Sequence, residues 1–279
     1  MAAQLQLTLK DPEPWFVAMQ AFDLISDYVQ PDSPISPAQI AQQLDSLTPG
    51  QRVLQDGERA EDPVSFQLEF WETLVSIAQQ IPCDHPSQDR LVKLMAALDE
   101  LASQLDEATS GDIISIWQCF SSLDNVLDDV WNEPTEMEDT FEPFQQWVNL
   151  NSFVARLFGE GLIDRYNYPF WTMRYALEAE EATTKDLRES RLAAATQWLV
   201  HGALAVFTVI RESRATESNQ MHLKSGLFMG DKVISFERWN FWREQLRSLE
   251  GRDISPEEKQ MASQAVAAMD DAEARYGQG

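Results

Sequence analysis

Apolar residues recur along most of this chain at intervals of three and four positions, which places them on one face of an α-helix. No alternation of apolar and polar residues is long enough to indicate a useful strand. We therefore predict an all-α protein, a single bundle of about nine or ten helices with no significant sheet. The predicted helices lie over residues 15–29, 36–47, 63–81, 87–105, 111–131 (as one helix or two short ones), 141–159, 168–182, 188–211, 235–250 and 256–275.

Three of these helices begin with the same signal, a capping side chain followed by proline at the first helical position. The pairs are Ser36-Pro37, Asp62-Pro63 and Ser255-Pro256. The last pair continues into Glu257-Glu258 and so completes a capping box, in which the serine and glutamate side chains bond each other's backbone N–H groups. We expect helices to begin at these prolines.

The predicted helix over residues 188–211 differs from the others because it is apolar nearly all round. No charged residue occurs between Leu192 and Ile210, so one interpretation is a membrane span. The stretch nevertheless contains Gln197, His201 and several alanines, and both of its ends carry acids and bases alike. We therefore favour a helix at the centre of the bundle, and we expect no association with a membrane.

The predicted helix over residues 235–250 carries large apolar side chains at helical spacing. Ser235 is its expected N-cap. Trp239 is at the centre of the apolar sector and is expected to anchor the core, whereas Phe241 falls outside the sector. The residues assigned to the sector are Phe236, Trp239, Trp242, Leu246 and Leu249.

The charge of the chain is strongly negative and unevenly distributed. The net charge is −25, of which residues 1–184, with 32 acids and 8 bases, carry −24. Such an acidic surface repels phosphate backbones and anionic lipids, so we expect no nucleic-acid binding. A protein partner could instead use the acidic surface together with residues 133–140, an acidic segment expected to form a mobile loop.

Cysteine usage and the start of the chain indicate an intracellular protein. The two cysteines, Cys83 and Cys119, have no metal-binding or redox spacing. The first residues show no basic segment followed by an apolar run, so no signal peptide is expected. We therefore expect a cytoplasmic location.

The nearest approach to a chemical motif is the pair Asp124 and Asp128, which share a helical face and could hold a hard cation. Enzymes that bind Mg²⁺-diphosphate in this way, such as terpene cyclases, need a second metal motif and basic residues, and neither occurs at the right spacing. We therefore interpret the pair as part of a solvated face, and we expect no metal and no cofactor. No nucleophile with a partner histidine stands out, so whether the protein is an enzyme is left open.

The shift in composition along the chain predicts three segments. Residues 1–14 read as a flexible arm, residues 15–140 as an acidic N-terminal helical half, and residues 141–279 as a C-terminal helical half. The two halves are expected to pack as one domain.

Four stretches of the second half match a known family pattern: WVNLNSFVARLFGEGLID (147–164), FWTMRYALE (170–178), KSGLFMGDKVISFERWNFWREQL (224–246) and AVAAMDDAEAR (265–275). Together they resemble the fungal proteins grouped as domain of unknown function 3632. Glu244-Gln245-Leu246 departs from the usual Arg-Phe ending, and Phe228-Met229-Gly230 is less basic than the usual loop. The resemblance implies a fungal, intracellular, helical protein, and it makes a role in specialised metabolism an expectation.

A set of aromatic and polar residues in this half is the candidate ligand site. Asn151 in an apolar sector needs hydrogen-bond partners, which either the protein or a ligand could supply. We expect the protein to handle a small, mostly apolar molecule; the alternative is a non-catalytic scaffold for protein–protein interaction. The candidate ligand-binding residues are Asn151, Trp171, Arg174, His201, Trp239, Trp242 and Arg243.

Overall fold

The computed structural model describes residues 2–54, 61–109, 115–138, 140–179, 184–212 and 227–277. Over these ranges the chain forms ten α-helices and no strand. The all-α prediction is therefore confirmed. The chain divides into two compact units, Met1–Glu133 (unit 1) and Pro134–Gly279 (unit 2). The expectation that the two halves pack as one domain stays a prediction.

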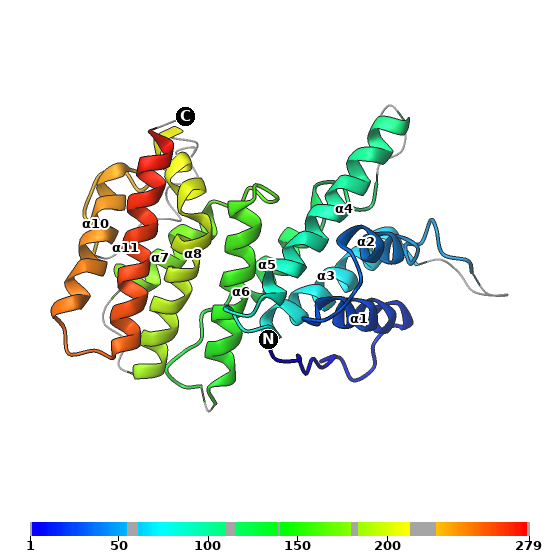
Figure 1. Ribbon diagram of the computed structural model, residues 1–279, viewed down its shortest axis with the longest axis horizontal. Helices are drawn as coiled ribbons and strands as arrows, with labels where there is room; N and C mark the ends of the chain where they lie inside the picture. The colour runs from blue at the N-terminus through cyan, green and yellow to red at the C-terminus, as the bar shows by residue number, and fades with distance from the viewer. Residues whose placement is uncertain are drawn as a thin grey trace. The chain divides into compact units, whose positions relative to one another are not determined.

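Unit 1 begins with residues 2–14, which form neither helix nor strand, and continues with five α-helices and one 3₁₀ turn (Figure 1). The expected start signals are confirmed, because Ser36 forms a capping box with Gln39 and the Asp62 carboxylate accepts the N–H groups of Val64 and Ser65. The elements are α1 (Phe16–Val29), α2 (Pro37–Asp45), α3 (Pro63–Gln80), α4 (Ser87–Thr109), η1 (Gln118–Phe120) and α5 (Leu123–Val130).

An aromatic cluster forms the core of unit 1. Trp71 and Trp117 are fully buried with their rings in edge-to-face contact at 5.9 Å. Each indole N–H has a partner, the Ser121 carbonyl for Trp71 and the Asp45 carboxylate for Trp117, both at 2.8 Å. An unpaired N–H on a buried indole would destabilise the fold. These two bonds therefore fix the segment around η1 against α2 and α3.

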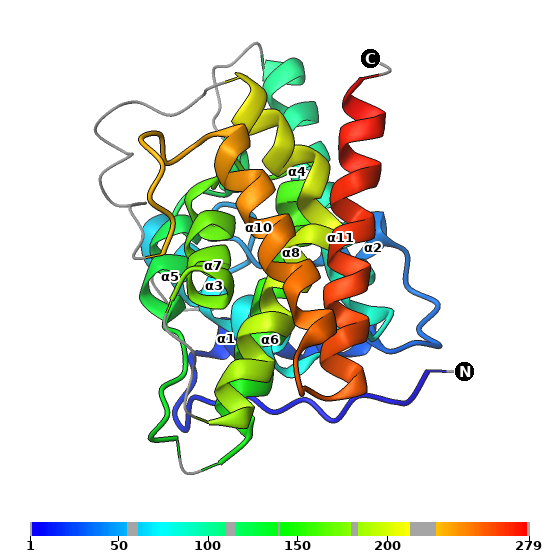
Figure 2. The same cartoon turned by 90° about the vertical axis from the view of Figure 1, so that its left-hand side faces the viewer.

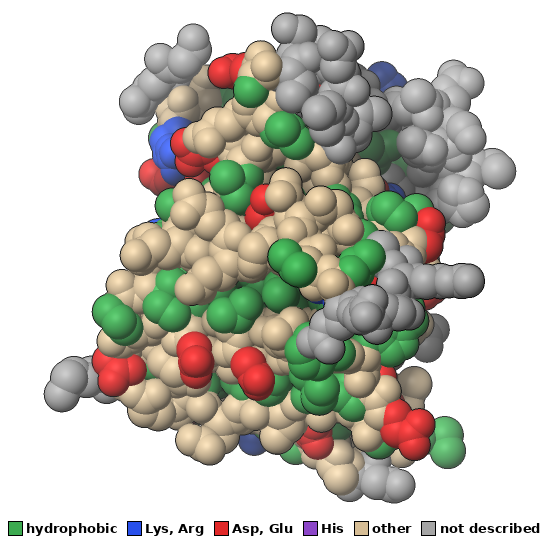
Figure 3. All heavy atoms as spheres, turned by 90° about the vertical axis from the view of Figure 1, so that its right-hand side faces the viewer, with side chains coloured by type: hydrophobic (Ala, Val, Ile, Leu, Met, Phe, Trp, Pro, Cys, Tyr) green, Lys and Arg blue, Asp and Glu red, His purple; other side chains and the backbone are tan. Residues whose placement is uncertain are grey.

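One face of the molecule shows the acidic character expected from the sequence. On the face that Figure 3 draws, acidic side chains are more widespread than basic ones. Asp124 and Asp128, which we interpreted as part of a solvated face, are exposed on α5. Among the described residues, no group of three or more His, Cys, Asp or Glu side chains is placed to hold a metal ion.

Unit 2 is built around one long helix, α8. This helix packs against α6, α7, α10 and α11. Figure 1 shows α8 between α11 and α6, and Figure 2 shows α10 and α11 side by side. The elements are α6 (Glu142–Gly159), α7 (Asn167–Leu177), α8 (Lys185–Glu212), α10 (Phe236–Ser248), η3 (Leu249–Gly251) and α11 (Pro256–Tyr276).

In the described part of the chain, α8 is the one helix long and apolar enough to cross a membrane. Of its most apolar window, 61% is buried inside the protein. An apolar helix that four neighbours cover has the surroundings of a bundle core, which supports the core interpretation of this helix over the membrane one.

α6 and α8 approach each other closely at two glycines. A Cβ atom added at Gly159 would overlap the carbonyl oxygen of His201, and one added at Gly202 would lie 3.4 Å from the carbonyl oxygen of Ala155. The missing side chain at Gly159 therefore sets the distance between the two helices.

We predict that Gly159→Ala lowers the free energy of unfolding by about 1–3 kcal/mol, because α6 and α8 must move apart to admit the methyl group. Chemical denaturation of the purified variant measures the change. Gly251→Ala is the matched control in the same unit, because nothing lies within 4 Å of its added Cβ. Equal stability changes in the two variants would contradict the close-approach argument.

Candidate functional site

A cavity of about 310 Å³ lies in unit 2 where α7 ends, α8 begins and the connection between α10 and α11 passes. None of the seven candidate residues is among the described residues that line it, so their contact with a ligand stays a prediction. The described lining residues are Tyr175, Ala176, Leu177, Ala179, Arg188, Arg191, Leu192, Leu227, Gln245, Leu249, Arg252, Ile254 and Glu258.

The lining combines apolar walls with a group of charged side chains. Leucine, isoleucine and alanine side chains make up most of it, whereas three arginines and one glutamate supply the formal charge. The chain as a whole carries −25, so the excess of arginine here is opposite in sign to the protein. A mostly apolar hollow with a few charged groups is the usual composition of a small-molecule site.

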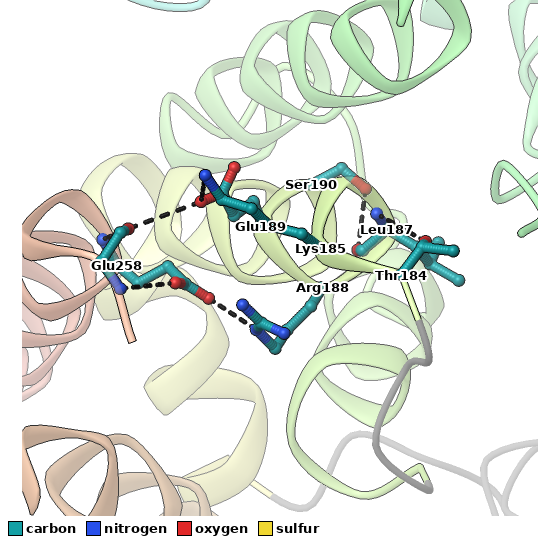
Figure 4. Close-up of polar contacts among 8 residues, drawn as sticks. Thr184, Lys185, Leu187, Arg188, Glu189, Ser190 and Glu258 are labelled. Atoms are coloured by element: carbon teal, nitrogen blue, oxygen red, sulfur yellow. Dashed lines mark hydrogen bonds and ion pairs between the residues drawn. The ribbon is translucent and has the colours of Figure 1, made fainter. Parts of the chain in front are cut away.

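Glu258 is fixed in this wall by its place in the first turn of α11. Its carboxylate accepts the backbone N–H of Ser255 at 2.9 Å, and the Ser255 hydroxyl accepts the N–H of Glu258 at 3.1 Å. This is the capping box expected from the sequence. The other carboxylate oxygen accepts the Nε–H of Arg188 from α8 at 2.8 Å (Figure 4).

The pKa of Glu258 is lowered from its usual value. Burial acts to raise the pKa, but the hydrogen bonds from Arg188 and Ser255 stabilise the carboxylate and outweigh it. Glu258 therefore stays ionised and pairs with Arg188, while Arg191 and Arg252 add two further cationic side chains to the lining.

Asn151 lies in the core of unit 2, away from the lining of the cavity. Its side chain is fully buried, and its Nδ2 donates to the Trp147 carbonyl at 2.8 Å. Its Oδ1 accepts the Trp198 indole N–H at 2.8 Å and the Thr172 hydroxyl at 2.9 Å. The expected need for partners is confirmed, and core side chains that join α6, α7 and α8 meet it.

Trp239 and Trp242 are fully buried, which confirms that the helix over 235–250 anchors the core. The Trp239 indole donates to Glu273 at 2.7 Å, and the Trp242 indole donates to Glu178. Phe236 was expected on the same buried face, but it is 42% exposed because it sits at the first position of α10, on the edge of the sector.

The remaining candidates are dispersed over unit 2. The Trp171 ring contacts Tyr168 edge-on at 5.7 Å, and the Arg174 guanidinium lies over the Tyr175 ring at 5.2 Å. His201 is half-buried on α8. Arg243 forms ion pairs with Asp270 at 3.3 Å and with Glu273 on α11. Arg243 and Trp239 share a partner, Glu273.

A buried ion pair between Glu178 and Arg238 was not predicted. Both side chains are fully buried, and two hydrogen bonds of 2.6 and 2.9 Å join them. The Arg238 guanidinium also donates to the Val233 carbonyl at 2.8 Å, and it lies near the rings of Phe170 and Trp242. The sequence contains a signal for the burial of Arg238. Arg238 precedes the apolar anchor Trp242 by four residues, so the two share a helical face.

Comparison with known proteins identifies one family. The family described as Protein of unknown function (DUF3632) matches residues 71–246, more than half of the chain. This range extends well before the stretches on which the resemblance was based. No protein of curated function and no solved structure matches the chain.

We predict that Trp239→Ala lowers the free energy of unfolding by about 3–5 kcal/mol, through lost burial and the cavity that remains. Trp242→Ala should cost a comparable amount. Phe241 is half-buried, so Phe241→Ala is the control and should cost less. Thermal melts of the three variants measure the order, and an unchanged midpoint for Trp239→Ala would refute the core assignment.

We predict that Glu178→Gln lowers the free energy of unfolding by about 3–5 kcal/mol, because it leaves the Arg238 charge buried without its counter-ion. The control is Asp271→Asn, which breaks the exposed pair with Arg275 at 3.7 Å and should change stability by about 0.5 kcal/mol at most. Denaturant titration of both variants is the measurement. A small effect of Glu178→Gln would show that water reaches the pair.

Proposed function

The chain belongs to the DUF3632 family, and we propose that it binds a small, mostly apolar molecule with one anionic group in the cavity of unit 2. The observation that carries the proposal is the lining, in which Arg188, Arg191 and Arg252 stand beside leucine and isoleucine walls. We keep the expectation that the protein handles a small apolar molecule, and we now assign its binding site to this cavity.

The size of the cavity limits the ligand. Its volume of about 310 Å³ lies at the small end of the range for ligand pockets. Since a water molecule occupies about 30 Å³ in the liquid, the cavity has room for roughly ten non-hydrogen atoms. A medium-chain carboxylic acid has this size.

The polar groups suit a carboxylate. A guanidinium presents parallel N–H donors that match the two oxygens of a carboxylate, and the bond is stronger than one between neutral groups. Arg188, Arg191 and Arg252 bring such donors to the lining, and Arg188 also pairs with Glu258. We assign the ligand's anionic group to the side of the cavity that these arginines line, and its apolar body to Leu192, Leu249 and Ile254.

A fungal origin and a role in specialised metabolism belong to the same proposal, since only the family resemblance suggests them. The scaffold alternative, with an acidic face and residues 133–140 that recruit a protein, stays a prediction. The cavity favours the ligand-binding function because a concave, mostly apolar site with a few charged groups is what small-molecule binding needs.

The test compares two probes of equal chain length, octanoate and 1-octanol, by isothermal titration calorimetry. We expect octanoate to bind at least about tenfold more tightly, because a hydrogen bond to a charged group contributes about 1.5–3 kcal/mol. Arg191→Gln and Arg252→Gln should each remove most of that preference while leaving 1-octanol binding unchanged.

Arg275→Gln is the matched control, because it removes an exposed arginine of α11 that is not among the lining residues. It should bind both probes as the wild-type chain does. Equal affinity for the two probes would refute the anionic group and keep the apolar site. If neither octanoate nor 1-octanol binds, the proposed function itself is refuted.

A further inference from the structure

Residues 2–10 are seated on the helices of unit 1 with a regular alternation. Leu5, Leu7 and Leu9 are half-buried, whereas the intervening side chains of Gln4, Gln6, Thr8 and Lys10 are exposed. Alternation with a period of two is the pattern of an extended strand that turns one face to the protein. In Figure 1 this arm is the dark blue trace that leads from the N-terminus to α1.

Two glutamines hold the backbone of the arm in the same way. The Gln30 side chain accepts the N–H of Leu5 at 3.0 Å and donates to the carbonyl of the same residue at 3.3 Å. The Gln80 side chain accepts the N–H of Thr8 at 2.9 Å and donates to its carbonyl at 3.0 Å. Each amide thus pairs with both main-chain groups of one arm residue, as a neighbouring strand would.

Both glutamines are held ready by their own helices. Gln30 follows the last residue of α1 and also donates to the Ser26 carbonyl at 3.1 Å. Gln80 is the last residue of α3 and also donates to the Ser76 carbonyl at 3.0 Å. The partner is four residues earlier in each case, so the same local bond orients both amides toward the arm.

The spacing of the two contacts matches the spacing of the helices. Three residues of extended chain, from Leu5 to Thr8, span roughly 10 Å. Packed helices lie about 8–10 Å apart, and α1 packs against α3. Neighbouring residues of a strand turn their main-chain groups to opposite edges, so Leu5 and Thr8 face opposite sides and the two glutamines flank the arm.

His85 adds a third contact to the main chain of the arm. Its Nε2 lies 2.9 Å from the Ala3 carbonyl, and its Nδ1 accepts the Ser87 N–H at 3.2 Å. The two bonds together require the neutral ring with its proton on Nε2. Ser87 in turn donates to the carbonyl of Val29, the last residue of α1. The contact of His85 with the arm therefore lies near the C-terminal end of α1.

We propose that Gln30, Gln80 and His85 form a peptide-binding site for an extended segment with leucine at alternate positions, which the protein's own arm occupies. Recognition through main-chain groups gives affinity for any extended peptide, and the half-buried leucines give selectivity. A segment of a partner protein with the same alternation would compete with the arm for this site.

The tether decides how strongly the arm competes. Only residues 11–15 separate the arm from α1, so its effective concentration is on the order of millimolar. A free peptide must overcome this concentration and binds the wild-type chain weakly. The site therefore opens to a partner only when the arm is weakened or removed.

The test uses the full chain with Leu5→Ser, Leu7→Ser and Leu9→Ser, which weakens the arm and leaves its main chain intact. A fluorescent peptide of residues 2–10, AAQLQLTLK, is titrated with this variant and with the wild-type chain, and its anisotropy is measured. We expect at least tenfold tighter binding to the variant. The control peptide AAQSQSTSK should bind at least tenfold more weakly than AAQLQLTLK.

A second variant adds Gln30→Leu and Gln80→Leu to the weakened arm. Peptide affinity should fall at least tenfold, with the helical circular dichroism signal unchanged. Retained affinity in this variant, or no peptide binding by a folded weakened-arm variant, would overturn the proposal. A dimer of the wild-type chain that Gln30→Leu and Gln80→Leu abolish would overturn the choice of partner, because two copies would then exchange arms.

Discussion

The ion pair between Glu178 and Arg238 is the constraint on which the arrangement of unit 2 depends. Both charges are removed from water, so each is stable only in the presence of the other. Trp242 donates to the same carboxylate, and the backbone of Leu227 donates to the Glu178 carbonyl at 3.2 Å. Glu178 therefore joins the end of α7 to α10 and to the segment before α10.

This constraint also places the walls of the cavity. Leu177 and Ala179 flank Glu178 in the sequence, and Leu227 is bonded to it, so three lining residues are positioned by the buried pair. Another part of the lining depends on Glu258, which caps α11 and holds Arg188. Buried carboxylates thus shape the cavity, and the arginines in its lining carry the charge that the proposed ligand would meet.

Polar side chains also connect helices elsewhere in the molecule. Asn151 joins three helices of unit 2 through its amide, and Gln67 in unit 1 donates to the Ile116 carbonyl at 2.6 Å. Gln30 and Gln80 apply the same chemistry to the arm. An amide serves these positions well because it donates and accepts at once, and so can join two groups of opposite hydrogen-bonding character.

Local patterns along the sequence determined the helices, their capped beginnings at Pro37, Pro63 and Pro256, and the burial of Trp239, because each depends on residues within a few turns of one another. Glu178 and Arg238 lie 60 residues apart in the sequence, and Thr8 and Gln80 lie 72 apart. No periodicity relates such positions, so only the tertiary structure decided that they meet. The short alternation at Leu5, Leu7 and Leu9 was visible in the sequence, but what it packs on was not. The position of the cavity was undecided for the same reason, since its lining comes from α7, α8, α10, η3, α11 and the segments between them, whose contacts arise only when the helices pack.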